Sequence, residues 1–364
     1  MFDPEHWAGL PFHFWSVVFF VFGAMIGSFL NVCIHRMPRE ESLVSPGSHC
    51  PHCNTAIPWH RNLPLISWLA LRGRCANCHG PISARYFLVE LLTALLFLGS
   101  WLAFGDRSWA LALIYCVLLA GLVVATFIDF EHYIIPDAVT LGGIVVGFVG
   151  SFLVPELHRA DAPTVALQRC FLGAGLGAGL IYGVGRLGKL FLGKHRLELP
   201  PASRVVFTET GLVLPDQEIP YGDLFYRASD AIELEAAQVE MVDRGYRDVP
   251  VRLTQTALRV GGEEFPTESV PGFEVVTDQI VVPREAMGLG DVKFMAAIGA
   301  FLGWSGVLFT LFASALMGAV VGLTLIALRR QDRSRPIQYG PYIAVAATIW
   351  IFAGDRILKW WLGV

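Results

Sequence analysis

The chain has 364 residues, of which 54% are hydrophobic and 16% are charged, and its net charge is −4. Soluble domains carry about 25% charged residues, and the mean hydropathy here is +0.54, so the composition argues against a purely soluble enzyme. The net charge gives no basic signature of a nucleic-acid-binding protein, and we expect no nucleic-acid partner.

Long apolar blocks predict a multi-pass α-helical membrane protein with about eight spans, because a spanning helix needs about 20 mostly apolar residues. The candidate spans are residues 13–33, 86–104, 108–128, 138–155, 168–192, 292–304, 306–328 and 340–362. The sixth is short. Residues 1–11 lack the basic region and small-residue cleavage site of a secretory signal, so we expect the first span to be retained.

Loop charge predicts the orientation of these spans. Short loops rich in Lys and Arg remain on the cytoplasmic side of a membrane. Three segments are rich in these residues, namely 34–85, 189–196 and 329–337. With eight spans and the N-terminus outside, all three face the cytoplasm, whereas seven spans would place the last one opposite the others.

Four cysteines form two CxxC pairs in the loop after the first span. They are Cys50 and Cys53 in CPHC, and Cys75 and Cys78 in CANC. Two such pairs on turns can close a tetrahedral thiolate cage around Zn²⁺, and four thiolates leave no open position for catalysis. We therefore predict a structural zinc site, with disulfides or unrelated thiols as the alternative. We expect the other three cysteines, Cys33, Cys116 and Cys170, to be packing residues.

Two carboxylates lie at the rims of predicted spans, where ionisable residues are costly and usually functional. Asp129 ends the third span and Asp291 opens the sixth. Brought together by packing of these spans, they could perform aspartyl proteolysis, with one accepting a proton from water and the other polarising the peptide carbonyl. The structural alternative is that both carboxylates either cap a helix or snorkel to the membrane interface. We expect Asp137 to be an N-cap of the fourth span.

Charged residues near the two aspartates and a glycine-rich stretch are further features of the sequence. Glu131, Glu285 and Lys293 are candidates for tuning the aspartate pair. The stretch GAGLGAGLIYGVG (173–185) looks like a nucleotide loop, but no strand precedes it. Glycines four residues apart allow helices to approach closely in lipid, so we predict helix packing there.

Residues 197–283 form an acidic segment with 16 Asp/Glu and 6 Lys/Arg, a net charge of −10, so the remainder of the chain carries +6. FTETGLVLPDQEIP (207–220) aligns with LTQTALRVGGEEFP (253–266) at an offset of 46, and a later gap pairs Asp230 with Asp278 and Ile232 with Ile280. Alternating apolar residues between turns indicate strands. We predict a duplicated β unit, with chance similarity as the alternative.

Five linked motifs resemble the type IV prepilin peptidases, which are bifunctional leader peptidases and N-methyltransferases of the GxGD type. The motifs are GSFLNVCIHRMP (27–38), the cysteine region with the start of the next helix (50–94), DFEHYIIPD (129–137), EAMGLGDVK (285–293) and YGPYIA (339–344). The chain departs from the pattern at Ala286, where glycine is usual, at Gln338, where proline is usual, and in the insert 197–283.

The resemblance implies a multi-pass enzyme of the bacterial cytoplasmic (inner) membrane, with its active site and zinc domain facing the cytoplasm. Its substrates would be prepilins of type IV pili or pseudopilins of type II secretion, whose basic leaders are cut after a glycine. The new amine would be methylated from S-adenosylmethionine. The catalytic roles would fall to Asp129 and Asp291, and Zn²⁺ binding to the four CxxC cysteines. It names neither the methyl-donor residues nor the oligomeric state.

The predicted organisation has five parts. They are a first span (1–35), a cytoplasmic four-cysteine zinc domain (36–85), spans two to five with the first aspartate (86–196), an acidic β-rich cytoplasmic insert (197–284), and the GxGD motif with spans six to eight (285–364). Two other functions are considered, a proton-coupled transporter with a zinc-stabilised domain and a membrane scaffold that presents the insert.

Overall fold

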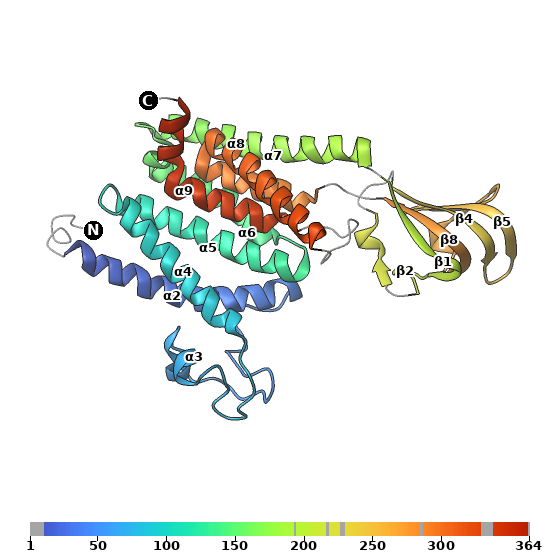
Figure 1. Ribbon diagram of the computed structural model, residues 1–364, viewed down its shortest axis with the longest axis horizontal. Helices are drawn as coiled ribbons and strands as arrows, with labels where there is room; N and C mark the ends of the chain where they lie inside the picture. The colour runs from blue at the N-terminus through green and yellow to red at the C-terminus, as the bar shows by residue number, and fades with distance from the viewer. Residues whose placement is uncertain are drawn as a thin grey trace. The chain divides into compact units, whose positions relative to one another are not determined.

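The computed structural model describes residues 11–192, 194–215, 218–225, 230–283, 287–328 and 338–362. Two compact units make up the chain (Figure 1). The helical unit comprises Met1–Ile181 and Leu289–Val364, and the insert unit comprises Tyr182–Gly288.

The apolar blocks of the sequence form long helices. The helices are α2 (Phe12–Arg36), α3 (Ile66–Ala70), α4 (Ala84–Phe104), α5 (Trp109–His132), α6 (Asp137–Leu153), α7 (Pro163–Leu192), α8 (Leu289–Ala327) and α9 (Gly340–Leu362). Within the described residues, six helices are long and apolar enough to cross a membrane, namely α2, α4, α5, α7, α8 and α9. The predicted class, a multi-pass α-helical membrane protein, is confirmed at this level.

The number of spans remains a prediction. Eight are reached only if the shorter apolar helix α6 also crosses and if α8 counts twice. Helix α8 is 39 residues long and is broken at Gly303, which has φ 67° and ψ −175°. A left-handed φ of this kind favours glycine, and the break falls at the penultimate residue of the sixth predicted span (292–304).

The break in α8 leaves a backbone carbonyl that needs a donor. Nε2 of His158 lies 3.0 Å from the carbonyl oxygen of Ala300 and 2.9 Å from Oγ of Ser151. A carbonyl can only accept, so this nitrogen carries the proton and donates it. The buried His158 therefore stabilises the kink, as unpaired backbone groups in an apolar region require.

The glycine-rich stretch lies within α7, and the prediction of helix packing is confirmed there. A Cβ added at Gly173 would lie 2.2 Å from the carbonyl oxygen of Gly299, and one at Gly177 would lie 2.5 Å from that of Met295. Both contacts are with α8. At Gly175 a Cβ would meet nothing within 4 Å, so only one face of the stretch packs.

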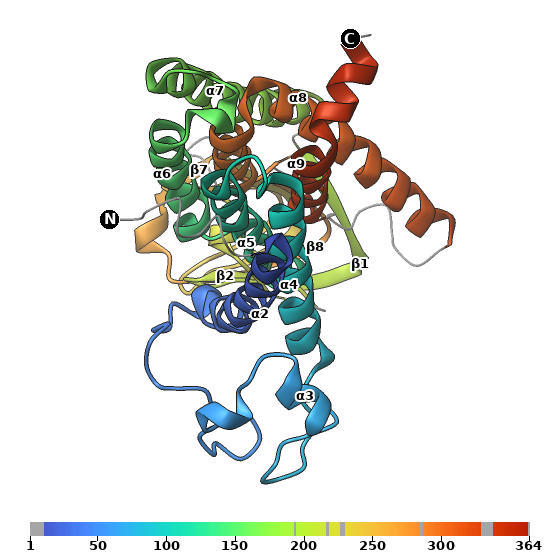
Figure 2. The same ribbon diagram turned by 90° about the vertical axis from the view of Figure 1, so that its left-hand side faces the viewer.

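The segment between α2 and α4 contains the CxxC pairs and the short helix α3, and it extends beyond the ends of those two helices in both views (Figures 1 and 2). Glu90 of α4 fixes part of this segment, because its Oε2 accepts a 2.7 Å hydrogen bond from the backbone of Leu65. The side chain of Asn31 in α2 donates to the carbonyl of Tyr86 at 3.0 Å, which ties α2 to the start of α4.

The insert unit is β-rich, as predicted. Its strands are β1 (Lys194–Phe207), β2 (Gly211–Val213), β3 (Glu218–Pro220), β4 (Ala231–Glu240), β5 (Gly245–Thr254), β6 (Ala257–Val260), β7 (Glu263–Pro266) and β8 (Phe273–Pro283). They form one sheet in the order β3-β2-β1-β8-β4-β5-β6-β7 with antiparallel neighbours. Entry strand β1 pairs with exit strand β8, with Lys194 opposite Pro283.

The sheet has internal two-fold pseudo-symmetry. Exchanging β1 to β4 with β5 to β8 reproduces the same strand order in reverse. Thr208 and Thr254, paired by the offset of 46, make the same turn: Oγ1 of Thr208 bonds to the backbone of Gly211 at 3.0 and 3.1 Å, and Oγ1 of Thr254 bonds to that of Ala257 at 2.9 and 3.0 Å. The repeated threonines are therefore turn-forming residues.

The later pairing of Asp230 with Asp278 and of Ile232 with Ile280 is wrong. The buried positions along β4 are Ile232, Leu234, Ala236 and Val239, and those along β8 are Phe273, Val275, Thr277, Ile280 and Val282. In both strands the alternation of buried and less buried residues shifts by one position after the third buried residue. The structure therefore matches Ile232 with Phe273. The connection before β8 is shorter than that before β4, which displaced the alignment of the two sequences.

Candidate active site and metal centre

Asp129 lies in the last turn of α5, and its side chain is buried, with the residue 6% exposed. Oδ2 of Asp129 accepts a 3.0 Å hydrogen bond from the backbone N–H of Gly340, the first residue of α9. A Cβ at position 340 would lie 2.7 Å from this oxygen. The close approach of backbone to carboxylate therefore requires glycine there.

A second hydrogen bond joins the start of α9 to α5. Gln338 donates from Nε2 to the carbonyl oxygen of Phe130 at 2.9 Å. Position 338 is a departure from the family pattern in the sequence, and its amide makes a hydrogen bond that a proline ring could not. The start of α9 is thus held beside Asp129 by two hydrogen bonds.

Asp291 lies in the first turn of α8, and its residue is partly buried. The adjacent Gly290 packs against Ile135, whose Cβ would be 3.5 Å from a Cβ at position 290. Burial raises the pKa of the Tyr339 phenol, the hydrogen bond with Ser314 lowers it, and the charge of Asp291 adds a smaller increase. The phenol is hydrogen-bonded to Oγ of Ser314 at 2.8 Å.

The adjacent residues Tyr339 and Gly340 thus each interact with one aspartate: the amide of Gly340 bonds to Asp129, and the phenol of Tyr339 is within electrostatic range of the Asp291 charge. A shared aspartate site, as predicted from the sequence, depends on packing of α5 against α8. In the structure, two further helices connect α5 with α8. Helices α6 and α9 each pack against both α5 and α8. The sequence did not single out Tyr339 or Gly340 as site residues, although the YGPYIA motif contains both.

Asp137 is not the N-cap of its helix, contrary to the sequence prediction. Pro136 occupies the N-cap position without a side-chain cap, and Asp137 is the first helical residue. Its carboxylate instead forms a 2.6 Å ion pair with Nζ of Lys293. Lys293 thereby links α8 to α6, two residues beyond Asp291.

Glu131 forms an ion pair with Arg85 at the start of α4. This pair, the Asp137–Lys293 pair and the Asp129–Gly340 hydrogen bond bring the ends of five helices together at one end of the helical unit. Glu285 and the basic segment 329–337 lie outside the described residues.

The two CxxC pairs form matching turns. In the first, the backbone N–H of Cys50 donates to Thr55 at 3.0 Å and that of Asn54 donates to Cys50 at 2.9 Å. In the second, Cys75 donates to Gly80 at 2.9 Å and His79 donates to Cys75 at 3.0 Å. Asn54 and His79 both have positive φ, at 53° and 56°, so each pair turns back on itself at the residue after its second cysteine.

These turns bring the four sulfurs together. The Sγ atoms of the quartet lie within 4.8 Å of one another, and Cys50 and Cys78 are 3.8 Å apart. Four sulfurs at about 2.3 Å from a tetrahedral metal lie roughly 3.8 Å from each other, so this donor set fits a metal ion. Hydrogen bonds with Thr55, and then with Asn77, lower the pKa of the Cys53 thiol to about 6, which favours the thiolate. Cys33, Cys116 and Cys170 are buried in helices.

The apolar helices, with Asp129 and Asp291 at helix ends, and the four-cysteine turns define a multi-pass membrane protein with a candidate metal centre. Family comparison gives the particular group. The Bacterial Peptidase A24 N-terminal domain matches residues 21–104, and the Type IV leader peptidase family matches residues 116–196 and 269–323. The chain belongs to the type IV leader peptidase family. The gap at 197–268 falls in the insert unit.

Curated relatives agree with this assignment. A prepilin leader peptidase/N-methyltransferase of Aeromonas hydrophila is 32% identical to the chain, with 97% of this chain and 96% of the relative covered. One of Pseudomonas aeruginosa is 27% identical, with 93% and 91% covered. One of Myxococcus xanthus is 45% identical over 40% of this chain and 44% of its own length. No solved structure matches the chain.

Proposed function

We propose that this protein is a membrane aspartyl endopeptidase that removes the basic leader of prepilins or pseudopilins after a glycine, and methylates the new N-terminus. The family assignment and the names of the near-full-length relatives support this function. The observation that supports the mechanism is that two neighbouring residues interact with the two aspartates, Gly340 by a hydrogen bond to Asp129 and Tyr339 through the charge of Asp291.

In this mechanism the two carboxylates have complementary protonation states. One, ionised, takes a proton from water as the water attacks the peptide carbonyl, and the other, protonated, donates a hydrogen bond to that carbonyl. Two carboxylates that share a site also share a proton, so their titrations are coupled. The amide of Gly340 holds Oδ2 of Asp129, which fixes the direction in which the carboxylate faces its water.

Zn²⁺ at Cys50, Cys53, Cys75 and Cys78 is a structural part of the proposal. The segment around these residues has little apolar core, since Cys50 and Cys75 are the buried apolar residues among 40–83 of the described chain. A bound metal supplies folding energy to such a segment. The methyl donor is proposed to be S-adenosylmethionine, and no residue is assigned to it.

The proposed location is the bacterial inner membrane, with eight spans and with the zinc domain and active site facing the cytoplasm. The basic segment that precedes α4 supports this orientation. The five-part division at residues 35, 85, 196 and 284 is part of the same proposal. The insert unit, Tyr182–Gly288, supports it in that it contains the fourth part, although it begins 15 residues earlier.

Cleavage of candidate prepilins from the same genome by the purified protein, read by mass spectrometry for cleavage and methylation, tests the function. Asp129→Asn and Asp291→Asn should each abolish cleavage in a protein that remains folded in the membrane. Asp137→Asn is the matched control, because its carboxylate pairs with Lys293, and it should retain much more activity. Near wild-type cleavage by either catalytic variant would refute the aspartyl mechanism.

A further inference from the structure

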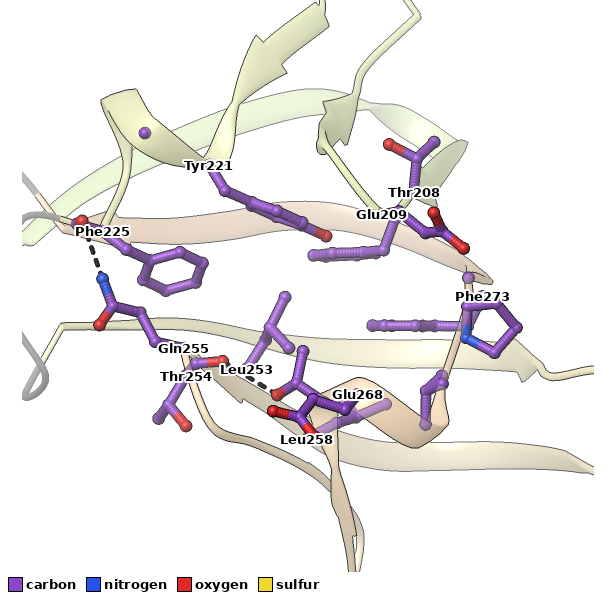
Figure 3. Close-up of a pocket in the computed structure, with 16 residues that line it drawn as sticks. Thr208, Glu209, Tyr221, Phe225, Leu253, Thr254, Gln255, Leu258, Glu268 and Phe273 are labelled. Atoms are coloured by element: carbon purple, nitrogen blue, oxygen red, sulfur yellow. Dashed lines mark hydrogen bonds between the residues drawn. The ribbon is translucent and has the colours of Figure 1, made fainter.

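The insert unit contains a pocket of about 620 Å³ between its two repeated halves. Matching positions of the two repeats line it, including Phe207 and Leu253 from β1 and β5, and Tyr221 and Thr267 from the turns after β3 and β7. Figure 3 shows Tyr221 of the first repeat on one side of the cavity and Leu253 of the second repeat on the other. The pocket therefore lies at the pseudo-two-fold axis of the sheet.

The pocket lining combines residues that the two repeats share with residues that differ between them. Thr208 and Thr254 make equivalent turns, and Leu212 and Leu258 are both fully buried. At the pocket, however, Glu209 corresponds to Gln255, Gly222 to Glu268, and Tyr221 to Thr267. The cavity is therefore asymmetric, although the fold around it is duplicated.

The chemistry of the lining has two parts. The floor is aromatic and aliphatic and consists of core residues of the sheet that expose little surface. It includes Phe207 and Phe273, whose rings stack with centroids 4.4 Å apart, together with Phe225 and Leu258. The rim is acidic. Glu209 and Glu268 are exposed there, the lining contains no Lys or Arg, and no ion pair within the described residues occupies either carboxylate.

A ligand for this pocket must combine apolar surface with positive charge. Binding pockets of this size usually pair a hydrophobic interior with a few polar groups that fix orientation. The surrounding segment, with a net charge of −10, attracts cations, and a cation is further favoured near aromatic rings. A peptide with an apolar side chain between Lys or Arg residues meets all of these requirements.

We propose that this pocket binds a basic peptide segment that places an apolar side chain on the aromatic floor and its flanking cations at Glu209 and Glu268. The inference rests on the proposed function in one respect, because the natural ligand would then be the basic leader of the substrate. The insert unit would thus hold the leader at a second site, separate from the carboxylates that cut it.

The charge requirement is tested by calorimetric binding of two probes to the full-length protein in detergent at low ionic strength. The probes are acetyl-Lys-Phe-Arg-Lys-amide and the same peptide with Ala in place of Phe. Glu209→Gln combined with Glu268→Gln should weaken binding of the first probe about five-fold, the effect of two exposed charge pairs. Glu198→Gln with Asp248→Asn makes the same change in net charge at exposed positions outside the pocket and should leave binding within about two-fold of wild type.

The apolar requirement has its own comparisons. The alanine probe should bind about ten-fold more weakly than the phenylalanine probe, since an aromatic side chain loses its buried surface. Gly222→Trp should block the pocket, because Gly222 lines it and a Cβ there meets nothing within 4 Å. Gly262→Trp is the control, since it is equally open and lies outside the lining.

Three results would overturn the proposal: equal weakening by both double charge variants, equal binding of the two probes, or full binding by Gly222→Trp. Equal weakening by both double variants would mean that only the net charge of the segment attracts the probe. Equal binding of the two probes, or full binding by Gly222→Trp, would mean that the pocket does not hold the apolar side chain. Neither probe contains glycine, so binding is measured without cleavage. A protein that cuts prepilin but ignores the probes would refute this inference alone, whereas one that binds them without cutting would refute only the proposed function.

Discussion

The backbone amide of Gly340 donates a 3.0 Å hydrogen bond to the carboxylate of Asp129, although the two residues are 211 positions apart in the chain. This bond connects the end of α5 to the start of α9. It also explains why a glycine stands between Tyr339 and Pro341, since the added methyl group of alanine would lie 2.7 Å from Oδ2.

Gly340→Ala should therefore displace the Asp129 carboxylate and lower the rate of prepilin cleavage. A misplacement of about 1 Å at a catalytic group can cost roughly 100-fold, and the measurement is the turnover rate at saturating substrate. Gly142→Ala provides the control, because a Cβ there meets nothing within 4 Å. Full activity in the Gly340 variant would mean that this contact does not position the carboxylate.

Elemental analysis of the purified protein should give about one zinc per chain, as expected for a site of four cysteine thiolates. Replacing Cys50 or Cys75 by Ser should lower this value and make residues 36–85 sensitive to protease, because the quartet closes both turns. Cys116→Ser, in the buried part of α5, should leave the zinc content unchanged. A metal-free protein whose loop still resists protease would contradict the structural role.

Packing of α7 against α8 predicts a difference between two neighbouring glycines. Gly173→Ala should lower the free energy of unfolding by about 1–3 kcal/mol, the usual cost of overpacking, because the helices must separate at the carbonyl of Gly299. Gly175→Ala, which meets open space, should be neutral or stabilising by up to about 1 kcal/mol. Thermal unfolding in detergent measures both, and similar midpoints would show that the helices do not meet at Gly173.

We further expect the acidic insert to attract basic leaders through its charge. Replacing residues 200–280 by a short Gly/Ser linker should weaken apparent substrate binding and reduce its salt dependence, with little change in turnover at saturation. The replacement is geometrically compatible with the chain, since Arg196 and Val281, which lie just outside the deleted stretch, are paired neighbours in the sheet. An unchanged salt profile in the deletion variant would remove electrostatic steering and leave docking or structural support.

Patterns that depend on local sequence predicted much of this structure. Hydropathy located the helices, spacing located the cysteine turns, and the repeat at an offset of 46 located the matching strands of the insert. The alignment failed after Pro220 and Pro266, where the two connecting segments differ in length. Apolar alternation alone cannot fix such a gap, because several registers bury similar residues.

The contacts of the site were less predictable because they join distant segments. The capping pattern at Asp137 was read locally, whereas its partner, Lys293, lies 156 positions away. Gln338 and Gly340 likewise act on α5 from the start of α9. The identity of such partners depends on how the helices pack, which the order of apolar segments leaves undetermined.

The pairing of β1 with β8 has a consequence for how a protein of this kind can change. Because the first and last strands of the insert are neighbours, with Lys194 opposite Pro283, the ends of the domain are about 5 Å apart. A folded domain of some 90 residues therefore begins and ends at neighbouring positions, as a tight turn does. The insert could be enlarged, duplicated or exchanged during evolution without moving α7 and α8 apart.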